Sequence, residues 1–523
     1  MTGSSPVVVA IDAGTGSARA LAFTETGECV SRAAVEWEHR AVPGQPGGTD
    51  FDAKAGWEAI ARAVREVVVA LGGRPVAAVV SSSMREGFVL FDAQGREIFA
   101  CPNTDGRART QADALFAEGL ADDVYRTAGD WVSITAPARL RWLAEHEPET
   151  LGRARHIGML SDWVNRNLCG EYLTDPTCGS SSALFDLGRR TWSHELAARV
   201  GLSADVLPTV VEPGTAIGRV TASASAATGL RVGTPVVMGG ADTQLALHAI
   251  AATSARPTIV AGTFWQTTAL TSTPVIDPQR RMRTLCHVDP QSWMVEGIGF
   301  LSGLAMRWFR DAFCPDAVLE AEKRGVSAFA VMEDWAQAVP IGSEGVVAVL
   351  SDVMQADAWH HAAPALVGFD IADPRRHNRG TVIRAIEEAA AFVAASHLDV
   401  LDELTSGATT AAGEVVFTGG SSAGRLWPTV IAGTTGLRTR TTLAPDATSY
   451  GAARLAGDAV GMSLPPLRQD ETAVVVAEGD RDAYRRAQEH WRRVYDAQRT
   501  ATVASGLTPL FTPPGAARPT ARH

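Results

Sequence analysis

Lysine is almost absent from this sequence. Only Lys54 and Lys323 occur among its 47 basic residues and 523 positions, and neither follows a glycine-rich loop. A P-loop places a lysine directly after its last glycine, and a protein kinase needs a lysine on a strand of its nucleotide-binding lobe. The sequence therefore excludes both motifs, so any nucleotide has to be bound without a lysine at its phosphates.

Long apolar runs and a surplus of basic residues are missing too. The apolar runs, of which Val7–Ile11 is an example, fall far short of the ~18 residues that a membrane span needs. Residues 1–6 contain no lysine or arginine of the kind that opens a signal peptide. The 58 acidic residues outnumber the 47 basic ones, and the resulting net charge of −11 argues against nucleic-acid binding. We expect a cytoplasmic protein whose partners include neither a membrane nor a nucleic acid.

The cysteines form no Cys-x-x-Cys pair and no metal-binding cluster with histidine. This pattern predicts free thiols in a reducing compartment. The adjacent pair His360-His361 lacks a third ligand nearby in the sequence, so we interpret it as structural. The six cysteines are Cys29, Cys101, Cys169, Cys178, Cys286 and Cys314.

Two similar groups of elements are predicted along the chain. In the first, apolar runs indicate three successive strands, a helix over 51–71 and a further strand, which together favour a mixed sheet covered by helices. Asp52 is a plausible cap for the start of that helix, and Gly72-Gly73 for its end. In the second, three apolar runs (235–238, 258–260 and 415–417) each lead into a glycine turn, and a helix is predicted over 381–404. The strands of the first group are expected at 7–11, 18–23, 29–37 and 76–80.

This organisation predicts an α/β protein with two domains. At roughly 150 residues per domain, the length allows two large ones. We place an N-terminal domain at 1–252 and a C-terminal domain at 253–505. The segment 506–523, which is rich in proline and poor in apolar residues, is expected to be disordered. Met306, Trp308, Phe309 and Phe313 fit the buried face of a helix in the second domain.

The turn Asp12-Ala13-Gly14-Thr15-Gly16-Ser17 is the first candidate for chemistry. A carboxylate at the end of a strand can hold Mg²⁺, and a turn of glycines and hydroxyls can donate hydrogen bonds to phosphate oxygens. The alternative is an ordinary hairpin turn, since aspartate and glycine are common there. A dinucleotide-binding turn is disfavoured, because Arg19 stands where a third glycine is needed and a strand follows.

Other candidates have structural alternatives as well. Asp242, in Gly239-Gly240-Ala241-Asp242, could accept the proton of a substrate hydroxyl, or simply cap a helix. The adjacent Arg85 and Glu86 could bind vicinal hydroxyls, or form a surface ion pair. Two turns, Gly262-Thr263 and Gly419-Gly420-Ser421, could approach a nucleotide or merely connect elements tightly.

Taken together, these motifs resemble those of the FGGY carbohydrate kinases in number, order and spacing, from about residue 7 to about residue 499. The resemblance implies the actin/hexokinase-like fold, in which two ribonuclease-H-like α/β domains surround a central cleft. It implies an ATP-dependent kinase that uses Mg²⁺ and a small polyhydroxy substrate, and it makes a homodimer plausible.

The resemblance also implies roles for individual residues. Asp242 resembles the general base of the family and, with Asp12, its Mg²⁺-binding carboxylates. The implied substrate contacts are Arg85, Glu86, Asp105, Asp242 and Gln244. The implied ATP contacts are Gly14, Thr15, Gly16, Ser17, Gly262, Thr263, Gly419, Gly420 and Ser421.

Four stretches (83–87, 262–266, 306–314 and 361–364) resemble one subfamily in particular. Its members phosphorylate the terminal hydroxyl of open-chain 4,5-dihydroxy-2,3-pentanedione. The sequence departs from that subfamily at Ala241, where glycine is usual, and over 446–451, where Glu-Ala-Thr-Ala-Leu-Gly is usual; the second departure could alter packing near the nucleotide. A kinase for xylulose, ribulose or a related polyol is the alternative, and an inactive sugar-binding regulator is a more distant one.

Overall fold

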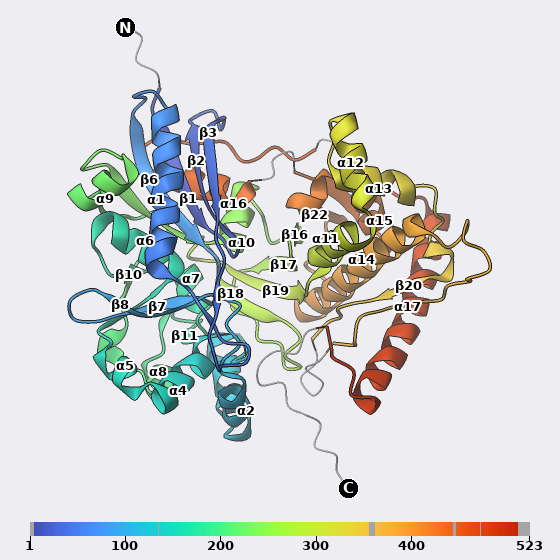
Figure 1. Ribbon diagram of the computed structural model, residues 1–523, viewed down its shortest axis with the longest axis horizontal. Coiled ribbons are helices and arrows are strands. Elements are labelled where there is room, and N and C mark those ends of the chain that lie inside the picture. The colour runs from blue at the N-terminus through green and yellow to red at the C-terminus, as the bar shows by residue number, and fades with distance from the viewer. Residues whose placement is uncertain (1–4, 134, 355–360, 443–445, 471, 511–523) are drawn as a thin grey trace.

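The computed structural model describes residues 5–133, 135–354, 361–442, 446–470 and 472–510. Two lobes, each built on a six-stranded sheet, lie side by side (Figure 1). The predicted α/β organisation in two similar units is therefore present. His360 and residues 511–523 of the predicted tail lie outside the described residues.

The first sheet combines an antiparallel meander with parallel strands. Its strand order is β14-β15-β6-β1-β2-β3. The central strand β1 pairs antiparallel with β2 and parallel with β6, and β6 pairs parallel with β15. The bounds are β1 Val7–Ala13, β2 Ser17–Thr24, β3 Cys29–Glu36, β6 Val76–Ser83, β14 Ala216–Arg219 and β15 Pro235–Ala241.

The second sheet repeats five strands of this arrangement. Its order is β18-β19-β17-β16-β22-β23, with β16 antiparallel to β17 and parallel to β22. The sixth strand differs, because β14 lies beyond the parallel strands and β18 beyond the antiparallel ones. The five shared strands explain why the chain carries two similar series of strands and glycine turns. The bounds are β16 Thr258–Ala261, β17 Trp265–Thr271, β18 Arg283–Cys286, β19 Trp293–Gly299, β22 Glu414–Thr418 and β23 Arg438–Thr441.

Helices cover both faces of each sheet. Alternate residues of β1 point to opposite sides: Val7, Val9 and Ile11 join one core cluster, whereas Val8 and Ala10 join another. The larger helices of the first lobe are α1 Ala53–Ala70, α4 Ala136–His146, α6 Leu160–Cys169 and α10 Asp242–Ala249. Those of the second are α11 Ser302–Phe313, α12 Pro315–Arg324, α13 Ala328–Ala336, α14 Arg379–Leu404, α15 Leu426–Thr435 and α17 Glu478–Ala504.

Shorter elements complete the two lobes. A three-stranded sheet of β7 Phe88–Phe91, β8 Glu97–Cys101 and β9 His156–Met159 belongs to the first lobe. The other helices of that lobe are α2 Arg109–Ala117, α3 Leu120–Ala128, α5 Pro148–Arg153, α7 Pro176–Ser180, α8 His194–Arg199 and α9 Ala222–Thr228. The remaining strands are β4 Arg40–Ala41, β5 Thr49–Asp50, β10 Leu173–Thr174, β11 Phe185–Asp186, β12 Thr191–Trp192, β13 Thr209–Val210, β20 Val347–Val349 and β21 Ala365–Val367.

The two predicted long helices form where the sequence places them. Helix α1 begins after Asp52, whose carboxylate accepts a hydrogen bond from the Ala55 amide at 2.9 Å. Helix α14 begins after Asn378, which accepts a hydrogen bond from the Gly380 amide, and is buried along most of its length. Burial on nearly every side explains why its sequence is alanine-rich rather than clearly two-faced.

The chain returns from the second lobe to the first at helix α16 (Ala447–Ala459). It lies within the range predicted for the C-terminal domain, yet it packs on the first sheet beside α10 (Figure 1). Tyr450 contacts Phe23 edge-on, with ring centroids 5.4 Å apart, and donates a hydrogen bond to the Pro465 carbonyl at 2.8 Å. Tyr450, within the departure at 446–451, thus packs on the first lobe.

Helix α11 differs from its predicted packing. Met306 and Phe309 are buried as expected, whereas Trp308 and Phe313 are each 50% exposed. Position 308 lies off the buried stripe, and Phe313 is the last residue of the helix, beyond the covering elements. None of the helices in the described ranges has the length and apolar character of a membrane span.

We predict that Gly451→Ala destabilises the protein. A methyl group at Gly451 would meet the Leu245 carbonyl oxygen at 1.8 Å, so α16 and α10 would have to move apart. Overpacking of this kind costs about 1–3 kcal/mol, measurable as a lower melting temperature. Gly479→Ala is the control, because a methyl group there meets nothing within 4 Å. Equal melting temperatures for the two variants would contradict the close packing of α10 and α16.

Candidate active site

The ends of three parallel strands bring the charged residues of the first lobe together. In the register of the sheet, Asp12 of β1 lies opposite Ser82 of β6, and Ala241 of β15 lies opposite Ser83. Arg85 follows β6, and Asp242 is the first residue of α10. Because carboxyl ends of parallel strands meet at one edge, all three charged side chains reach the same region.

The second lobe presents its glycine turns in the same way. Strands β16 and β22 are parallel, with Val260 opposite Thr418, so Gly262-Thr263 and Gly419-Gly420 leave the sheet at neighbouring points. The Thr263 carbonyl accepts hydrogen bonds from the first amides of α11, at 3.2 and 3.3 Å. The predicted nucleotide turns are thereby held next to each other.

A cavity of about 510 Å³ is lined by residues of both lobes. Thr15, Arg85, Glu86, Asp105 and Asp242 are the predicted site residues that line it. The other lobe contributes residues that the motifs did not indicate: Phe264, Gln266, Arg283, Ile298 and Phe300. Asp12, Gly14, Gly16, Ser17, Gln244 and the two nucleotide turns of the second lobe lie outside its lining.

Asp242 keeps a largely free carboxylate. Its side chain is 38% exposed, its Oδ1 accepts a hydrogen bond from the Thr243 amide at 2.6 Å, and Arg85 Nε lies 3.6 Å from the same oxygen. Burial raises the pKa of Asp242 to about 6, with Arg85 opposing and Asp12 adding to the rise. A carboxylate with this pKa is ionised at neutral pH and is a stronger base than an ordinary aspartate.

Asp12 is the second carboxylate at this edge. Burial raises the pKa of Asp12, while Arg19 and a 2.8 Å hydrogen bond from the Ser82 hydroxyl oppose the rise. Asp12 contributes to the raised pKa of Asp242, so the two carboxylates are close enough to share a divalent cation. Mg²⁺ takes one or two carboxylates and completes its shell with water and phosphate, so a pair of carboxylates at this edge fits it.

Glu86 belongs to a buried ionic cluster. Its carboxylate accepts a hydrogen bond from Arg283 Nη1 at 2.7 Å, and its backbone has a φ of 63°, unusual for a residue other than glycine. Arg283 also lies 3.3 Å from Asp130 and 2.7 Å from Glu296. Strain and buried charge at one point are typical of functional sites.

Two residues predicted to bind substrate form hydrogen bonds with other groups of the protein. The Asp105 carboxylate is fully buried; it accepts hydrogen bonds from Arg107 Nε at 2.8 and 2.9 Å and from the Thr49 amide at 2.9 Å. Gln244 is also fully buried, and its amide nitrogen donates to the Cys286 carbonyl at 3.3 Å. These contacts fix the cavity wall, and the roles of both residues toward a substrate stay predictions.

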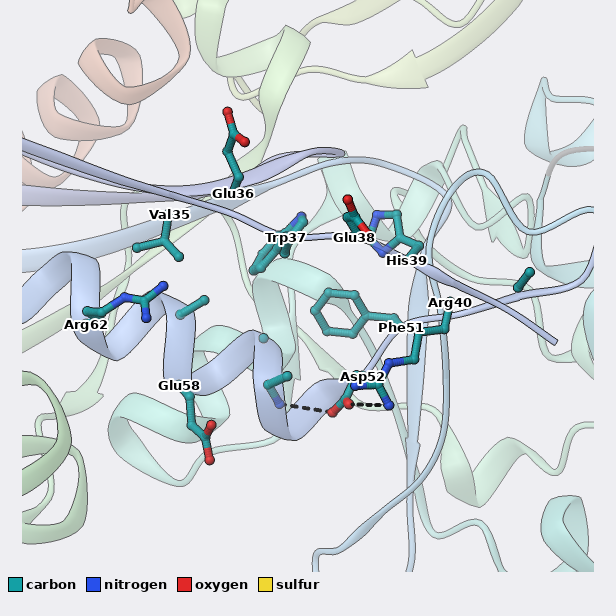
Figure 2. A pocket seen from close by; sticks show the side chains of 14 residues that line it. Val35, Glu36, Trp37, Glu38, His39, Arg40, Phe51, Asp52, Glu58 and Arg62 are labelled. Atoms are coloured by element: carbon teal, nitrogen blue, oxygen red, sulfur yellow. Dashed lines mark hydrogen bonds and ion pairs between the residues drawn. The ribbon is translucent and has the colours of Figure 1, made fainter.

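Hydrogen bonds to its backbone hold the predicted phosphate-binding turn in place. The Gly14 amide donates to the Ser17 carbonyl at 3.0 Å, which closes the turn. The Trp37 indole donates to the carbonyls of Gly14 and Thr15, and His39 Nε2 donates to the Thr15 carbonyl at 2.7 Å. Trp37 and His39 also line a separate cavity of about 710 Å³ between β3 and α1 (Figure 2).

The strand before Asp242 accommodates alanine at position 241. A methyl group at Gly239 would meet the Ser81 carbonyl at 1.8 Å, and one at Gly240 would meet Thr177 Oγ1 at 2.6 Å. Ala241, in contrast, has ordinary extended backbone angles, and its amide donates to Thr177 Oγ1 at 2.8 Å. The departure from the usual glycine therefore leaves Asp242 in place. The hydroxyl of Thr448 on α16 also contacts this segment, donating to the Asp242 carbonyl at 3.1 Å.

The comparisons with known proteins define the class. The N-terminal domain model of the FGGY family of carbohydrate kinases matches residues 7–249, and the C-terminal domain model matches residues 258–460. The chain belongs to the FGGY family of carbohydrate kinases, and the predicted family, fold and kinase activity are confirmed.

Curated relatives named autoinducer-2 kinase match almost the whole chain. The protein from Salmonella typhimurium is 38% identical over 530 residues, and that from Photorhabdus laumondii is 36% identical over 524 residues; each alignment covers 98% of both chains. Among solved structures, gluconate kinase from Lactobacillus acidophilus superposes with a TM-score of 0.82 at 18% identity, covering 95% of this chain and 99% of that chain. Xylulose kinase from Rhodospirillum rubrum superposes with a TM-score of 0.79 at 23% identity and the same coverage.

We predict that activity falls in acid as Asp242 is protonated. The predicted role of base requires Asp242 to be ionised, and its pKa is raised to about 6. Above that value kcat/KM should be nearly constant; below it kcat/KM should drop by about a factor of ten per pH unit. ADP release measured between about pH 5 and 8 checks this. A rate that holds its neutral value at the acid end would contradict a base of this pKa.

Proposed function

We propose that the enzyme phosphorylates the terminal hydroxyl of open-chain autoinducer-2, 4,5-dihydroxy-2,3-pentanedione. The products would be phospho-autoinducer-2 and ADP, and the physiological role would be the processing of a quorum signal. The choice of substrate rests on relatives named autoinducer-2 kinase, 98% of whose length aligns with this chain. The position of the reaction rests on one observation, the free carboxylate of Asp242 on the cavity between the lobes.

Asp242 acts as the general base in this proposal. It accepts the proton of the substrate hydroxyl as the oxygen attacks the γ-phosphorus, and the bond to the β,γ-bridging oxygen of ATP breaks in line. Arg85 and Glu86 line the same cavity and would orient the other oxygens of the substrate. The apolar side chains of Phe264, Ile298 and Phe300 offer a surface for the methyl end of the pentanedione.

The phosphates of ATP would lie between the turns of the two lobes. Gly14, Thr15, Gly16 and Ser17 approach from the first lobe. Gly262, Thr263, Gly419, Gly420 and Ser421 approach from the second. Since no lysine is available here, backbone amides and hydroxyls have to stabilise the negative charge that develops. Asp12 and Asp242 would hold Mg²⁺, which supplies positive charge to the transferring phosphoryl group.

The location and assembly of the enzyme are part of the same proposal. A kinase that consumes ATP is expected in the cytoplasm, where ATP is plentiful, and free thiols suit that compartment. All six cysteines are free in the structure. A homodimer stays a prediction.

We predict a strong preference for the pentanedione in a substrate panel. ADP release with Mg·ATP would be compared for 4,5-dihydroxy-2,3-pentanedione, D-xylulose, L-ribulose, erythritol and glycerol. A preference for a pentulose or polyol would keep the kinase mechanism but reject the proposed substrate. No turnover with any of them would favour a sugar-binding regulator.

We predict that Asp242→Asn lowers kcat at least about 10²-fold, because the amide cannot accept the proton. The amide keeps the size of the side chain, so the melting temperature should change little. Asp205→Asn is the control, since it makes the same substitution at an exposed aspartate of the first lobe that does not line the cavity. An Asp242→Asn enzyme of nearly normal activity would remove Asp242 from the role of base.

A further inference from the structure

Glu296 is a carboxylate of the second lobe that contacts the site of the first. It lies on β19, its side chain is completely buried, and it is surrounded by apolar residues along the strand. Its two oxygens accept hydrogen bonds from Arg85 Nη1 at 3.0 and 2.9 Å, and one of them also accepts from Arg283 Nε at 2.7 Å. Glu296 therefore joins two arginines, one from each lobe.

The other edge of the Arg85 guanidinium faces Asp242. Arg85 Nε lies 3.6 Å from Asp242 Oδ1 and 3.9 Å from Glu86 Oε1. Hydrogen bonds between nitrogen and oxygen are normally 2.7–3.2 Å long, so Arg85 lies beside Asp242 without bonding to it. The guanidinium is planar and rigid, so the hydrogen bonds that hold Nη1 also fix the position of Nε.

Arg85 would otherwise have a strong reason to bind Asp242. Opposite charges in surroundings with little water attract strongly, and a bidentate arginine–carboxylate pair is the favoured arrangement. Such a pair would occupy the oxygens that Asp242 needs for the substrate proton. Glu86 and Asp12 also act on Asp242. Both are negatively charged, so neither would counteract the attraction between Asp242 and Arg85.

Glu296 is also connected to the nucleotide side of the cleft. In the second sheet it lies opposite Thr268 of β17, and β17 begins directly after the Gly262-Thr263 turn. The residue that holds Arg85 thus belongs to the lobe predicted to bind ATP. The hydrogen bonds from Arg85 to Glu296 therefore require the two lobes to keep their present relative positions.

We propose that Glu296 is a positioning residue for phosphoryl transfer: from the opposite lobe it holds Arg85 away from Asp242, and so keeps the Asp242 carboxylate free for the substrate hydroxyl. The proposal rests on Asp242 being the base, and it is independent of which carbohydrate is phosphorylated.

Glu296→Gln is the main test, because it keeps the shape of the side chain and removes its charge. Arg85 should then turn to Asp242, and kcat should fall roughly tenfold or more, whereas the KM for ATP should change less than twofold. A general loss of packing would change both. An unchanged kcat would overturn the proposal.

A double-mutant cycle separates positioning from a structural role. If Glu296 acts through Arg85, then Glu296→Gln should have almost no further effect on kcat in an Arg85→Gln background, because no guanidinium is left to reach Asp242. Multiplicative losses from the two substitutions would overturn the proposal. Glu388→Gln is the matched control: Glu388 is a buried glutamate of the same lobe, paired with Arg384 at 3.0 Å, and its loss should lower stability without changing kcat.

A second variant covers the case in which Glu296→Gln does not fold. Glu296→Asp retains the charge but shortens the reach by one methylene, so it cannot hold both arginines at their present distances. It should lower kcat severalfold at an unchanged KM for ATP, and full activity would overturn the proposal. Asp242→Asn is measured in parallel: its loss of activity, together with a normal Glu296→Gln enzyme, would reject the role of Glu296 and leave the base in place.

Discussion

The structure depends on buried opposite charges that meet where the two lobes face each other. Arg85, Glu86 and Asp130 come from the first lobe, and Arg283 and Glu296 from the second. Charges taken out of water are costly unless they are paired, and breaking one such pair costs roughly 3–5 kcal/mol. The first lobe alone would leave Arg85 without its main acceptor, so the cluster favours the arrangement in which both lobes contribute to one cavity.

This constraint explains how the predicted site residues are arranged. Parallel strand ends bring Asp12, Arg85 and Asp242 to one edge, but they do not by themselves determine which charges pair. The second lobe determines the pairing, because its strands β18 and β19 place Arg283 and Glu296 next to the charged residues of the first lobe. Asp242 is left as a carboxylate with one close neighbouring cation and an open approach from the cavity.

Much of the fold and part of the site could be predicted from the sequence. An apolar run that ends in glycine and aspartate is a local signal, which is why Asp12, Asp242 and the nucleotide turns stand out. Glu296 could not be found in this way, because its partner Arg85 is 211 positions away in the chain. The only local hint is a single carboxylate in the otherwise apolar run Trp293–Gly299.

Packing over long distances also limits what periodicity predicts. Trp308 is a residue type expected in a core, but its position on α11 lies off the buried stripe and leaves it half exposed. Asp105 lines the cavity, but its carboxylate accepts hydrogen bonds from Arg107 and from the Thr49 amide, and its role toward a substrate stays a prediction. The exposure of Trp308 and the contact with Thr49 depend on neighbours that are distant in the sequence.

The return of α16 to the first lobe has a consequence for how the chain is made. The face of the first sheet that carries Val8, Ala10 and Val237 is covered by α10 and α16. A ribosome completes all strands of that sheet long before it synthesises α16, so an apolar surface has to wait, exposed, while the whole second sheet emerges. The first lobe is therefore completed only after nearly all of the second, of which helix α17 is still to follow.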